Sequence, residues 1–145
     1  MTRKEKIEYA KDTLLICLRF AIIIFTVLFI TKNFSLQQES GHSMDPTFDD
    51  GDIILVSLNA KPKDGDVVIL TTSYIDNYEV EGDHVIKRYY EDYSTDGLFV
   101  LGDNAKVSYD SRYYGEAPME ACEGVVVYDI SKGFRGIVAT ITSIF

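Results

Sequence analysis

The chain has 145 residues, which is enough for one domain with a modest hydrophobic core. Acidic residues outnumber basic ones by 23 to 14, so a nucleic-acid partner is disfavoured, because phosphate binding needs clustered Lys and Arg. The two cysteines, Cys17 and Cys122, lie in segments of different character, and this pattern predicts neither an internal disulfide nor a thiolate metal site.

An apolar run covers residues 13–31, with the sequence TLLICLRFAIIIFTVLFIT. Its length is close to the roughly 20 residues that a helix needs to cross a bilayer. Arg19 lies near the inner end of the run and can extend its charge toward the membrane surface. Residues 1–31 carry five bases and three acids, whereas the rest of the chain carries nine bases and twenty acids. A basic segment before an apolar run orients the N-terminus toward the cytoplasm.

We therefore predict a cytoplasmic N-terminus at residues 1–12, a transmembrane anchor helix at 13–31 and an extracytoplasmic β domain at 32–145. One alternative is a cleaved signal peptide, which is disfavoured because the segment TKNFSLQQES offers no small-x-small cleavage site. The other alternative is a buried helix of a soluble domain.

From Gly41 onward the sequence favours an all-β fold, a small coiled antiparallel β domain. Short segments rich in Val, Ile and aromatic residues are predicted as strands at 52–57, 66–70, 84–90, 98–101 and 124–130. The polar segments Asp76–Asp83 and Glu91–Gly97 are predicted as hairpin tips, and no long amphipathic helix is predicted after residue 32. The apolar tail at 137–145 is too short to span a membrane and is predicted as a last strand, with a segment resting on the lipid surface as the alternative.

The stretch SGHSMDPTF at residues 40–48 places Ser43 just beyond the apolar run. A serine hydroxyl is a poor nucleophile until a base takes its proton. His42 is adjacent to Ser43, and neighbouring side chains in an extended segment point apart. His84 and Lys87 lie three residues apart in one predicted strand, so at most one of them faces Ser43.

Lys87 follows two apolar residues, Val85 and Ile86, in that strand. Burial can lower a lysine pKa from about 10.4 toward 7–8, where the neutral amine acts as a general base. Arg88 would then point the other way, into solvent or toward an acid. The alternative is that Lys87 and Arg88 are ordinary charges on the strand surface.

Residues 100–115, VLGDNAKVSYDSRYYG, are dense in side chains that fix loops. Asp110 and Arg112 could pair with each other or brace neighbouring loops, and Ser108 could hold a lysine amine in line. A calcium loop is disfavoured because Tyr114 stands at the twelfth position from Asp103, where a bidentate acid is needed. We therefore predict no metal site.

The segments GHSMDPTF, GDIILV, GDVVIL, VIKR and GDNAKVSYDSRYYG, in this order behind an N-terminal anchor, resemble a bacterial type I signal peptidase as far as about Gly124. The resemblance implies a serine–lysine dyad, with Ser43 as nucleophile and Lys87 as general base. It implies that Ser108 orients the lysine. The further site residues that it implies are Asp103, Asp110 and Arg112 as structural support, and Met44 beside the substrate pocket.

Two features of the motifs refine this expectation. Gly41 occupies a position where some members of the family have a serine as second oxyanion donor, so the Ser43 backbone N–H is the donor expected here. Lys87 stands where the eukaryotic and archaeal branch has histidine, which favours the bacterial branch and leaves His84 without a catalytic role.

The implied function is that of a membrane-anchored serine endopeptidase, single-pass in the cell membrane, with a cytoplasmic N-terminus and an extracytoplasmic catalytic domain. Its expected partners are exported preproteins and the lipid bilayer, with no metal, other cofactor or nucleic acid. Three alternatives stay open. They are a dedicated maturation peptidase for a pilin-like or surface substrate, a non-catalytic assembly factor with the same fold, and a soluble self-cleaving repressor-like relative.

Overall fold

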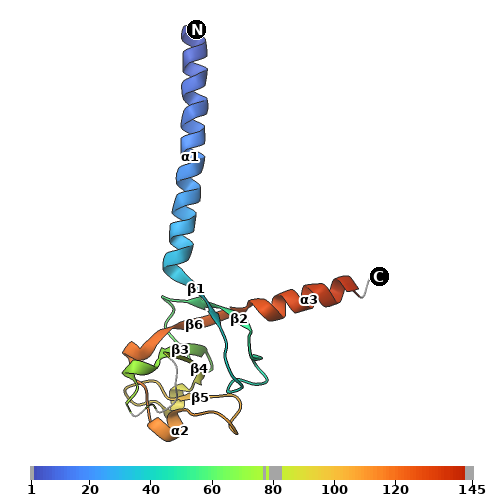
Figure 1. Ribbon diagram of the computed structural model, residues 1–145. Helices are drawn as coiled ribbons and strands as arrows, with labels where there is room; N and C mark the ends of the chain where they lie inside the picture. Colours follow the sequence, from blue (N-terminus) through green and yellow to red (C-terminus); the bar gives the residue numbers. More distant parts are fainter. Residues whose placement is uncertain (1, 77, 79–82, 143–145) are drawn as a thin grey trace. The chain divides into compact units, whose positions relative to one another are not determined.

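The computed structural model describes residues 2–76, 78 and 83–142 (Figure 1). The chain divides into two compact units, Met1–Asn33 and Phe34–Phe145. We describe each unit by itself.

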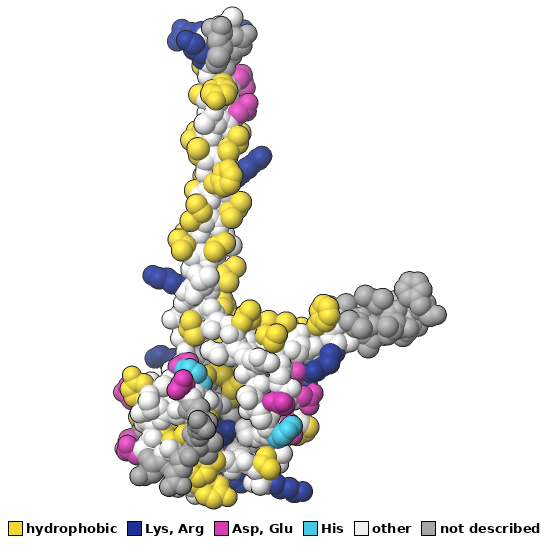
Figure 2. Space-filling view, in the orientation of Figure 1, with side chains coloured by type: hydrophobic (Ala, Val, Ile, Leu, Met, Phe, Trp, Pro, Cys, Tyr) yellow, Lys and Arg dark blue, Asp and Glu magenta, His cyan; other side chains and the backbone are white. Residues whose placement is uncertain are grey.

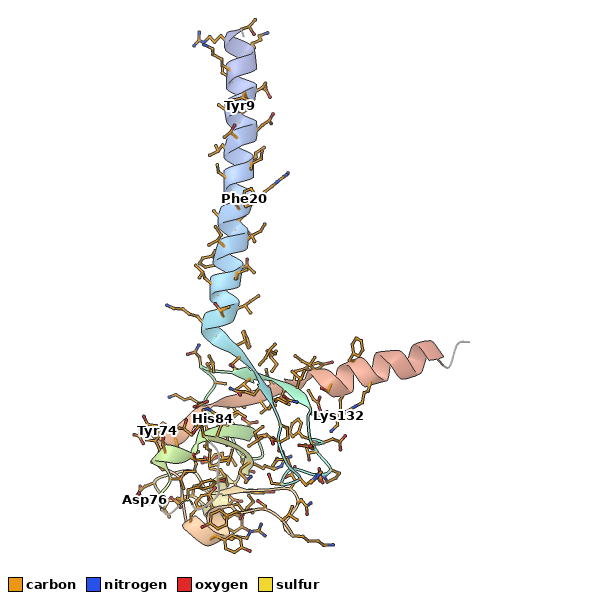
Figure 3. The ribbon with its side chains drawn as sticks, in the orientation of Figure 1. Tyr9, Phe20, Tyr74, Asp76, His84 and Lys132 are labelled. Carbon is orange, nitrogen blue, oxygen red and sulfur yellow. The ribbon has the colours of Figure 1, made fainter. Side chains whose placement is uncertain are left out.

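The first unit is a single helix, α1 (Arg3–Asn33). The segment Lys6–Asn33 is long and apolar enough to cross a membrane, and its side chains are exposed. Tyr9 and Phe20, both exposed, are labelled on α1 in Figure 3, and apolar side chains cover much of the face of α1 that Figure 2 shows. The helix begins ahead of the predicted span at 13–31 because residues 3–12 contain no glycine or proline to break it.

The second unit is built on one six-stranded antiparallel sheet with the order β1-β2-β6-β3-β4-β5. Its strands are β1 (Phe34–Gln38), β2 (Ile53–Ser57), β3 (Val67–Thr71), β4 (His84–Tyr89), β5 (Val100–Leu101) and β6 (Cys122–Asp129). The all-β prediction is confirmed, and each of the five predicted strands overlaps an observed one. β1 was not predicted, because its sequence FSLQQ is short and mostly polar.

Short helical turns connect these strands. They are η1 (Thr72–Tyr74), η2 (Glu91–Tyr93), α2 (Ser111–Tyr114) and η3 (Met119–Ala121). Glu91–Gly97 joins the antiparallel neighbours β4 and β5, as predicted for a hairpin tip. The other predicted tip, Asp76–Asp83, lies partly outside the described residues, which omit 77 and 79–82.

The predicted last strand is wrong, because the tail belongs to a helix, α3 (Ile130–Thr142). The prediction that no long amphipathic helix follows residue 32 is wrong for the same reason. Apolar residues stand at 130, 134, 137, 138 and 141, a spacing of three or four that suits one face of a helix rather than a strand. The first turns of α3 are tied to β2 and the turn before it. The Ile53 N–H donates to Ser131 Oγ at 2.8 Å, and Arg135 pairs with Asp52 at 2.9 Å.

The hydrophobic core contains two clusters to which β3 contributes alternately. Val68 and Leu70 belong to one cluster, and Val67 and Ile69 to the other. The second cluster also takes in apolar side chains from the SMDPTF stretch and from β2 and β4, namely Met44, Phe48, Ile54, Val56 and Ile86. Burying such a side chain fully is worth about 1.5–3 kcal/mol. Packing therefore holds the segment that carries Ser43 against the sheet.

Candidate active site

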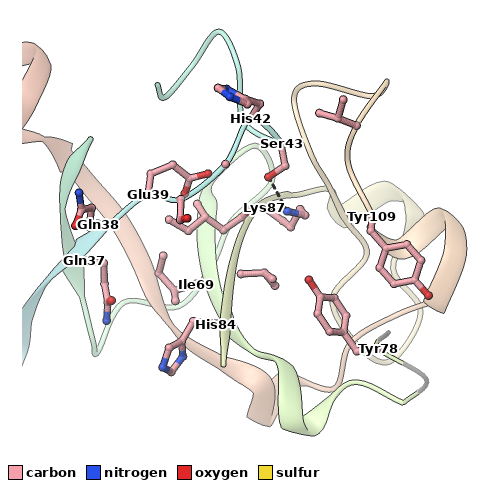
Figure 4. Close-up of a pocket in the computed structure, with 15 residues that line it drawn as sticks. Gln37, Gln38, Glu39, His42, Ser43, Ile69, Tyr78, His84, Lys87 and Tyr109 are labelled. Carbon is pink, nitrogen blue, oxygen red and sulfur yellow. Dashed lines mark hydrogen bonds between the residues drawn. The ribbon is translucent and has the colours of Figure 1, made fainter. Parts of the chain in front are cut away.

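Ser43 and Lys87 meet at one hydrogen bond. Lys87 Nζ lies 2.9 Å from Ser43 Oγ and 3.0 Å from the Ile86 carbonyl oxygen (Figure 4). Lys87 belongs to β4, whereas Ser43 lies in the turn between β1 and β2. The sheet and the turn thus bring together the nucleophile and the base that the motifs predict.

Lys87 is buried in β4, with only 4 % of its surface exposed. The strand register sets it opposite Val68, a fully buried core residue. Burial lowers the pKa of Lys87 below its ordinary value, whereas the charges of Glu39 and Asp110 act to raise it. The environment therefore favours the neutral amine, the form that can accept a proton.

The two histidines near Ser43 have other partners. His84 is exposed on β4, and its Nδ1 lies 3.0 Å from Glu123 Oε1. His42 Nδ1 lies 3.2 Å from Asp45 Oδ2. The prediction that at most one of His84 and Lys87 faces Ser43 is thus confirmed, and the residue that faces it is Lys87.

The backbone of Ser43 is held by the loop that follows β5. The Asn104 N–H donates to the Ser43 carbonyl at 2.9 Å. Within the part of the chain that the structure describes, the Ser43 N–H makes no hydrogen bond. It is therefore free to stabilise an oxyanion. Gly41, with φ of +99°, turns the chain two residues before Ser43.

Asp103 ties that loop to β4 and to the segment that carries Ser43. It accepts hydrogen bonds from Arg88 Nε at 2.8 Å and Nη2 at 2.5 Å, and from the Thr47 hydroxyl. Burial acts to raise the pKa of Asp103, but the bonds from Arg88 and Thr47 outweigh it and hold the pKa below its ordinary value. Arg88 thus points toward an acid, as predicted, and Asp103 braces the turn in which Ser43 lies.

Asp110 is fully buried and organises the same loop from within. It accepts hydrogen bonds from the Ser108 hydroxyl at 2.7 Å and the Gly102 N–H at 2.9 Å, and from Arg112 Nε at 2.7 Å and Nη2 at 2.6 Å. Burial acts to raise the pKa of Asp110, but the bonds from Arg112 and Ser108 lower it. The predicted pairing of Asp110 with Arg112 is confirmed. Ser108 is buried and bound to Asp110, and its action on Lys87 stays a prediction.

Gly102 marks a close approach between the loop and Ser43. A Cβ at this position would lie 2.2 Å from Ser108 Oγ and 2.6 Å from the Ser43 carbonyl oxygen. Both distances are too short for any side chain, so the loop approaches Ser43 because residue 102 is glycine.

A cavity of about 470 Å³ opens beside the hydroxyl and the amine (Figure 4). Its walls are residues 37–43, Ile69, Tyr78, His84, Val85, Ile86, Lys87, Val107 and Tyr109. Met44, predicted beside the substrate pocket, does not line this cavity and lies fully buried in the core. Ile69 and Ile86 supply apolar wall instead, and Gly41 lies in the wall as expected.

Glu39 is a cavity residue that the motifs did not indicate. Only 3 % of its surface is exposed, and burial raises its pKa to about 7. The sequence showed a glutamate in a polar stretch, and nothing in that stretch signalled burial. Tyr78 and Tyr109, whose ring centroids lie 5.6 Å apart, were also missed, because their loops meet only in the folded chain.

Comparison with protein families matches residues 30–127 to Peptidase S24-like proteins, about two thirds of the chain. The chain belongs to the Peptidase S24-like family. The matched region includes every predicted site residue, from Gly41 to Arg112. Membership of the Peptidase S24-like family assigns this β domain a peptidase fold of the serine type and makes hydrolysis its expected chemistry. A search of curated proteins found no match to the chain.

Proposed function

We propose that this protein is a membrane-anchored serine endopeptidase that removes signal peptides from exported preproteins with a Ser43–Lys87 dyad. The observation that carries the proposal is the 2.9 Å contact between Lys87 Nζ and Ser43 Oγ, made by a lysine that is 4 % exposed. Burial lowers the pKa of an amine in such a place and so favours the neutral form, which acts as a base, whereas a lysine on the surface has no such environment.

In the proposed reaction, Ser43 Oγ forms a bond to the carbonyl carbon that precedes the scissile bond. Lys87 Nζ takes the hydroxyl proton in the same step. The Ser43 N–H donates to the oxyanion that develops. When the peptide bond breaks, the Lys87 ammonium returns the proton to the leaving amine, and an acyl-enzyme remains. Water then attacks the ester with Lys87 again as base, which releases the acid product and restores Ser43.

The loop carboxylates have a positioning role in this scheme. Asp103 holds Thr47 and Arg88, and Asp110 holds Ser108 and the Gly102 N–H. Each carboxylate therefore braces backbone next to Ser43 or Lys87. A small displacement of either reacting group lowers the rate steeply, because the reaction needs near-attack geometry.

The apolar helix supports the choice of substrate. Ser43 is 13 residues beyond Ile30, a distance of at most about 43–47 Å in a fully extended chain. An enzyme anchored through α1, with its N-terminus in the cytoplasm, would keep the nucleophile near the outer membrane surface, where the cut in a signal peptide also lies. Confinement to one thin layer raises the effective concentration of the substrate.

A dedicated maturation peptidase is the second candidate, and the composition of the cavity favours it. Gln37, Gln38, Glu39 and His84 make part of the wall polar, and such a wall selects among substrates more strictly than shallow apolar pockets do. A non-catalytic assembly factor is disfavoured, because a binding protein has no need of a buried amine on a serine hydroxyl.

Processing of preproteins in reconstituted vesicles tests the proposal. The substrate carries Ala at the first and third residues before the cut, and the enzymes are wild type, Ser43→Ala, Lys87→Ala and the control Lys61→Ala, which changes an exposed lysine. We expect cleavage by wild type and Lys61→Ala and none by the two dyad variants. Equal cleavage by all four enzymes would contradict the dyad. Cleavage of one natural precursor but not of general preproteins would identify the dedicated peptidase.

A further inference from the structure

The Glu39 carboxylate is a charged group in the cavity wall that the proposed mechanism does not use. It lies four residues before Ser43, and every residue from 39 to 43 lines the cavity. Figure 4 draws its carboxylate turned to the side on which Ser43 and Lys87 lie. Only 3 % of the surface of Glu39 is exposed, yet its carboxylate has no hydrogen bond or ion pair to any described residue.

A buried carboxylate without a partner is costly, so it either takes up a proton or binds a cation. The nearest protein cation that acts on Glu39 is Lys87, and that amine is already bound to Ser43. The other charges that act on it are the carboxylates of Asp45, Asp50 and Asp52. His42 and Arg135 pair with Asp45 and Asp52, and Asp50 accepts the Gly41 N–H. Among the described residues that line the cavity, the groups that can carry a positive charge are Lys87, His42 and His84, and each already has another partner. The Glu39 carboxylate therefore has no cation of its own there.

We propose that Glu39 is a specificity-determining residue that binds a basic side chain, Lys or Arg, of the substrate within four residues of the scissile bond. The inference rests on the proposed function. Four residues span at most about 14 Å, so a substrate that runs along residues 39–43 meets Glu39 within that many positions of Ser43.

A basic side chain suits this part of the cavity better than an apolar or an acidic one. It supplies a charge-assisted hydrogen bond to the carboxylate, whereas an apolar side chain leaves the carboxylate unsatisfied and an acidic one repels it. Ile69 and Ile86 offer apolar wall against which the aliphatic stem of Lys or Arg can pack. The chain beyond residue 31 carries nine bases and twenty acids, so its field also attracts a cationic segment.

Peptide binding to the full-length Ser43→Ala protein in detergent tests the inference, because this variant binds without cleaving. The probes are fluorescent peptides with Lys or norleucine at each of the four positions before the cut, two side chains of similar length that differ in charge. We expect the Lys peptide to bind about tenfold more tightly at one position at least. Adding Glu39→Gln should bring that ratio close to one, and adding Glu39→Leu should reverse it.

Glu120→Gln, an equal change of charge on an exposed residue outside the cavity, is the matched control and should keep the tenfold ratio. A ratio of one at all four positions, or a ratio that Glu39→Gln leaves unchanged, would overturn the inference. The same peptides given to the wild-type enzyme separate the two proposals. Cleavage without preference for Lys removes the role of Glu39 alone, whereas a binding preference without any cleavage removes the peptidase and keeps the site.

Discussion

Lys87 Nζ lies 2.9 Å from Ser43 Oγ although 44 positions separate the two residues in the chain. Three kinds of contact fix this distance. The register of β3 and β4 sets Lys87 opposite Val68, Met44 anchors the turn that carries Ser43 in the core, and the Asn104 N–H holds the Ser43 carbonyl. The arrangement costs stability, because it keeps an amine out of water.

Replacing that amine by an apolar side chain should stabilise the fold. Because burial lowers the folded-state pKa of Lys87, the unfolded chain binds more protons below pH 10.5, and the free energy of unfolding rises with pH up to that value. We expect Lys87→Met to raise the free energy of unfolding at pH 7 by about 1–2 kcal/mol and to remove this rise. Urea denaturation at pH 7 and pH 10 measures both the gain in stability and its dependence on pH. Lys61→Met, on the surface, should change little at either pH, and a less stable Lys87→Met protein at pH 7 would count against a buried neutral amine.

The charge of Glu39 sets part of the pH dependence of activity. Above its own pKa of about 7, where Glu39 is ionised, its negative charge acts to raise the pKa of Lys87, so Glu39→Gln should lower that pKa further. The acidic limb of kcat/KM, which reports protonation of the base in the free enzyme, should therefore move to lower pH. A peptide without Lys or Arg near the cut keeps substrate binding by Glu39 out of the comparison. An unmoved or alkaline-shifted limb would show that the Glu39 charge does not reach the dyad.

Gly102 should be required for activity beyond its contribution to stability. In Gly102→Ala the new Cβ would displace Ser108 and the Ser43 carbonyl, whereas in Gly124→Ala it would meet the Ser57 carbonyl oxygen at 2.5 Å, away from the site. Overpacking of this kind costs about 1–3 kcal/mol in either variant. At a temperature where both remain folded, we expect Gly102→Ala to lose most of its kcat and Gly124→Ala to keep it. Similar kcat values in the two variants would refute the close approach.

The Asp103–Arg88 pair should make the fold sensitive to acid. Because the folded-state pKa of Asp103 is lowered, the pair contributes stability above the ordinary pKa of 3.8, and this contribution is lost as pH falls through the folded-state pKa. We expect Asp103→Asn to lower the free energy of unfolding at pH 7 by about 1.5–3 kcal/mol. A lysine in the Arg88→Lys variant should not replace the arginine, because its amine cannot make both hydrogen bonds to Asp103. The control is Asp92→Asn, which changes an exposed acid. A loss of the same size in that variant would contradict the stabilising role of the Asp103–Arg88 pair.

The sequence was most informative where short motifs coincide with strand alternation. Alternation in HVIKRYY predicted that Lys87 and His84 face opposite ways and that Arg88 points away from Lys87, and the register of β4 confirms both statements. Asp110 and Arg112, two residues apart, were expected either to pair with each other or to brace neighbouring loops, and the two side chains do pair. These are local properties of the chain, which a sequence carries directly.

The features that were missed depend on contacts between distant segments. Glu39 is buried because the segment after β1 runs beside Asp52, with the Glu39 N–H bound to the Asp52 carbonyl at 2.8 Å. Met44 lies in the core rather than the cavity wall because its side chain joins one buried cluster with Ile69 and Ile86. The tail forms a helix rather than the predicted strand because its apolar residues recur every three or four positions, a spacing that suits α3.

The measurement that tests the central claim most directly is the protonation state of Lys87, followed by ¹⁵N NMR of its side-chain nitrogen in the full-length protein as the pH is raised. We predict that the Nζ resonance titrates below 10.5, the ordinary lysine value, and that it still does so in Ser43→Ala. An Nζ that stays an ammonium group up to the ordinary lysine pKa would contradict the proposed base and, with it, the Ser43–Lys87 mechanism.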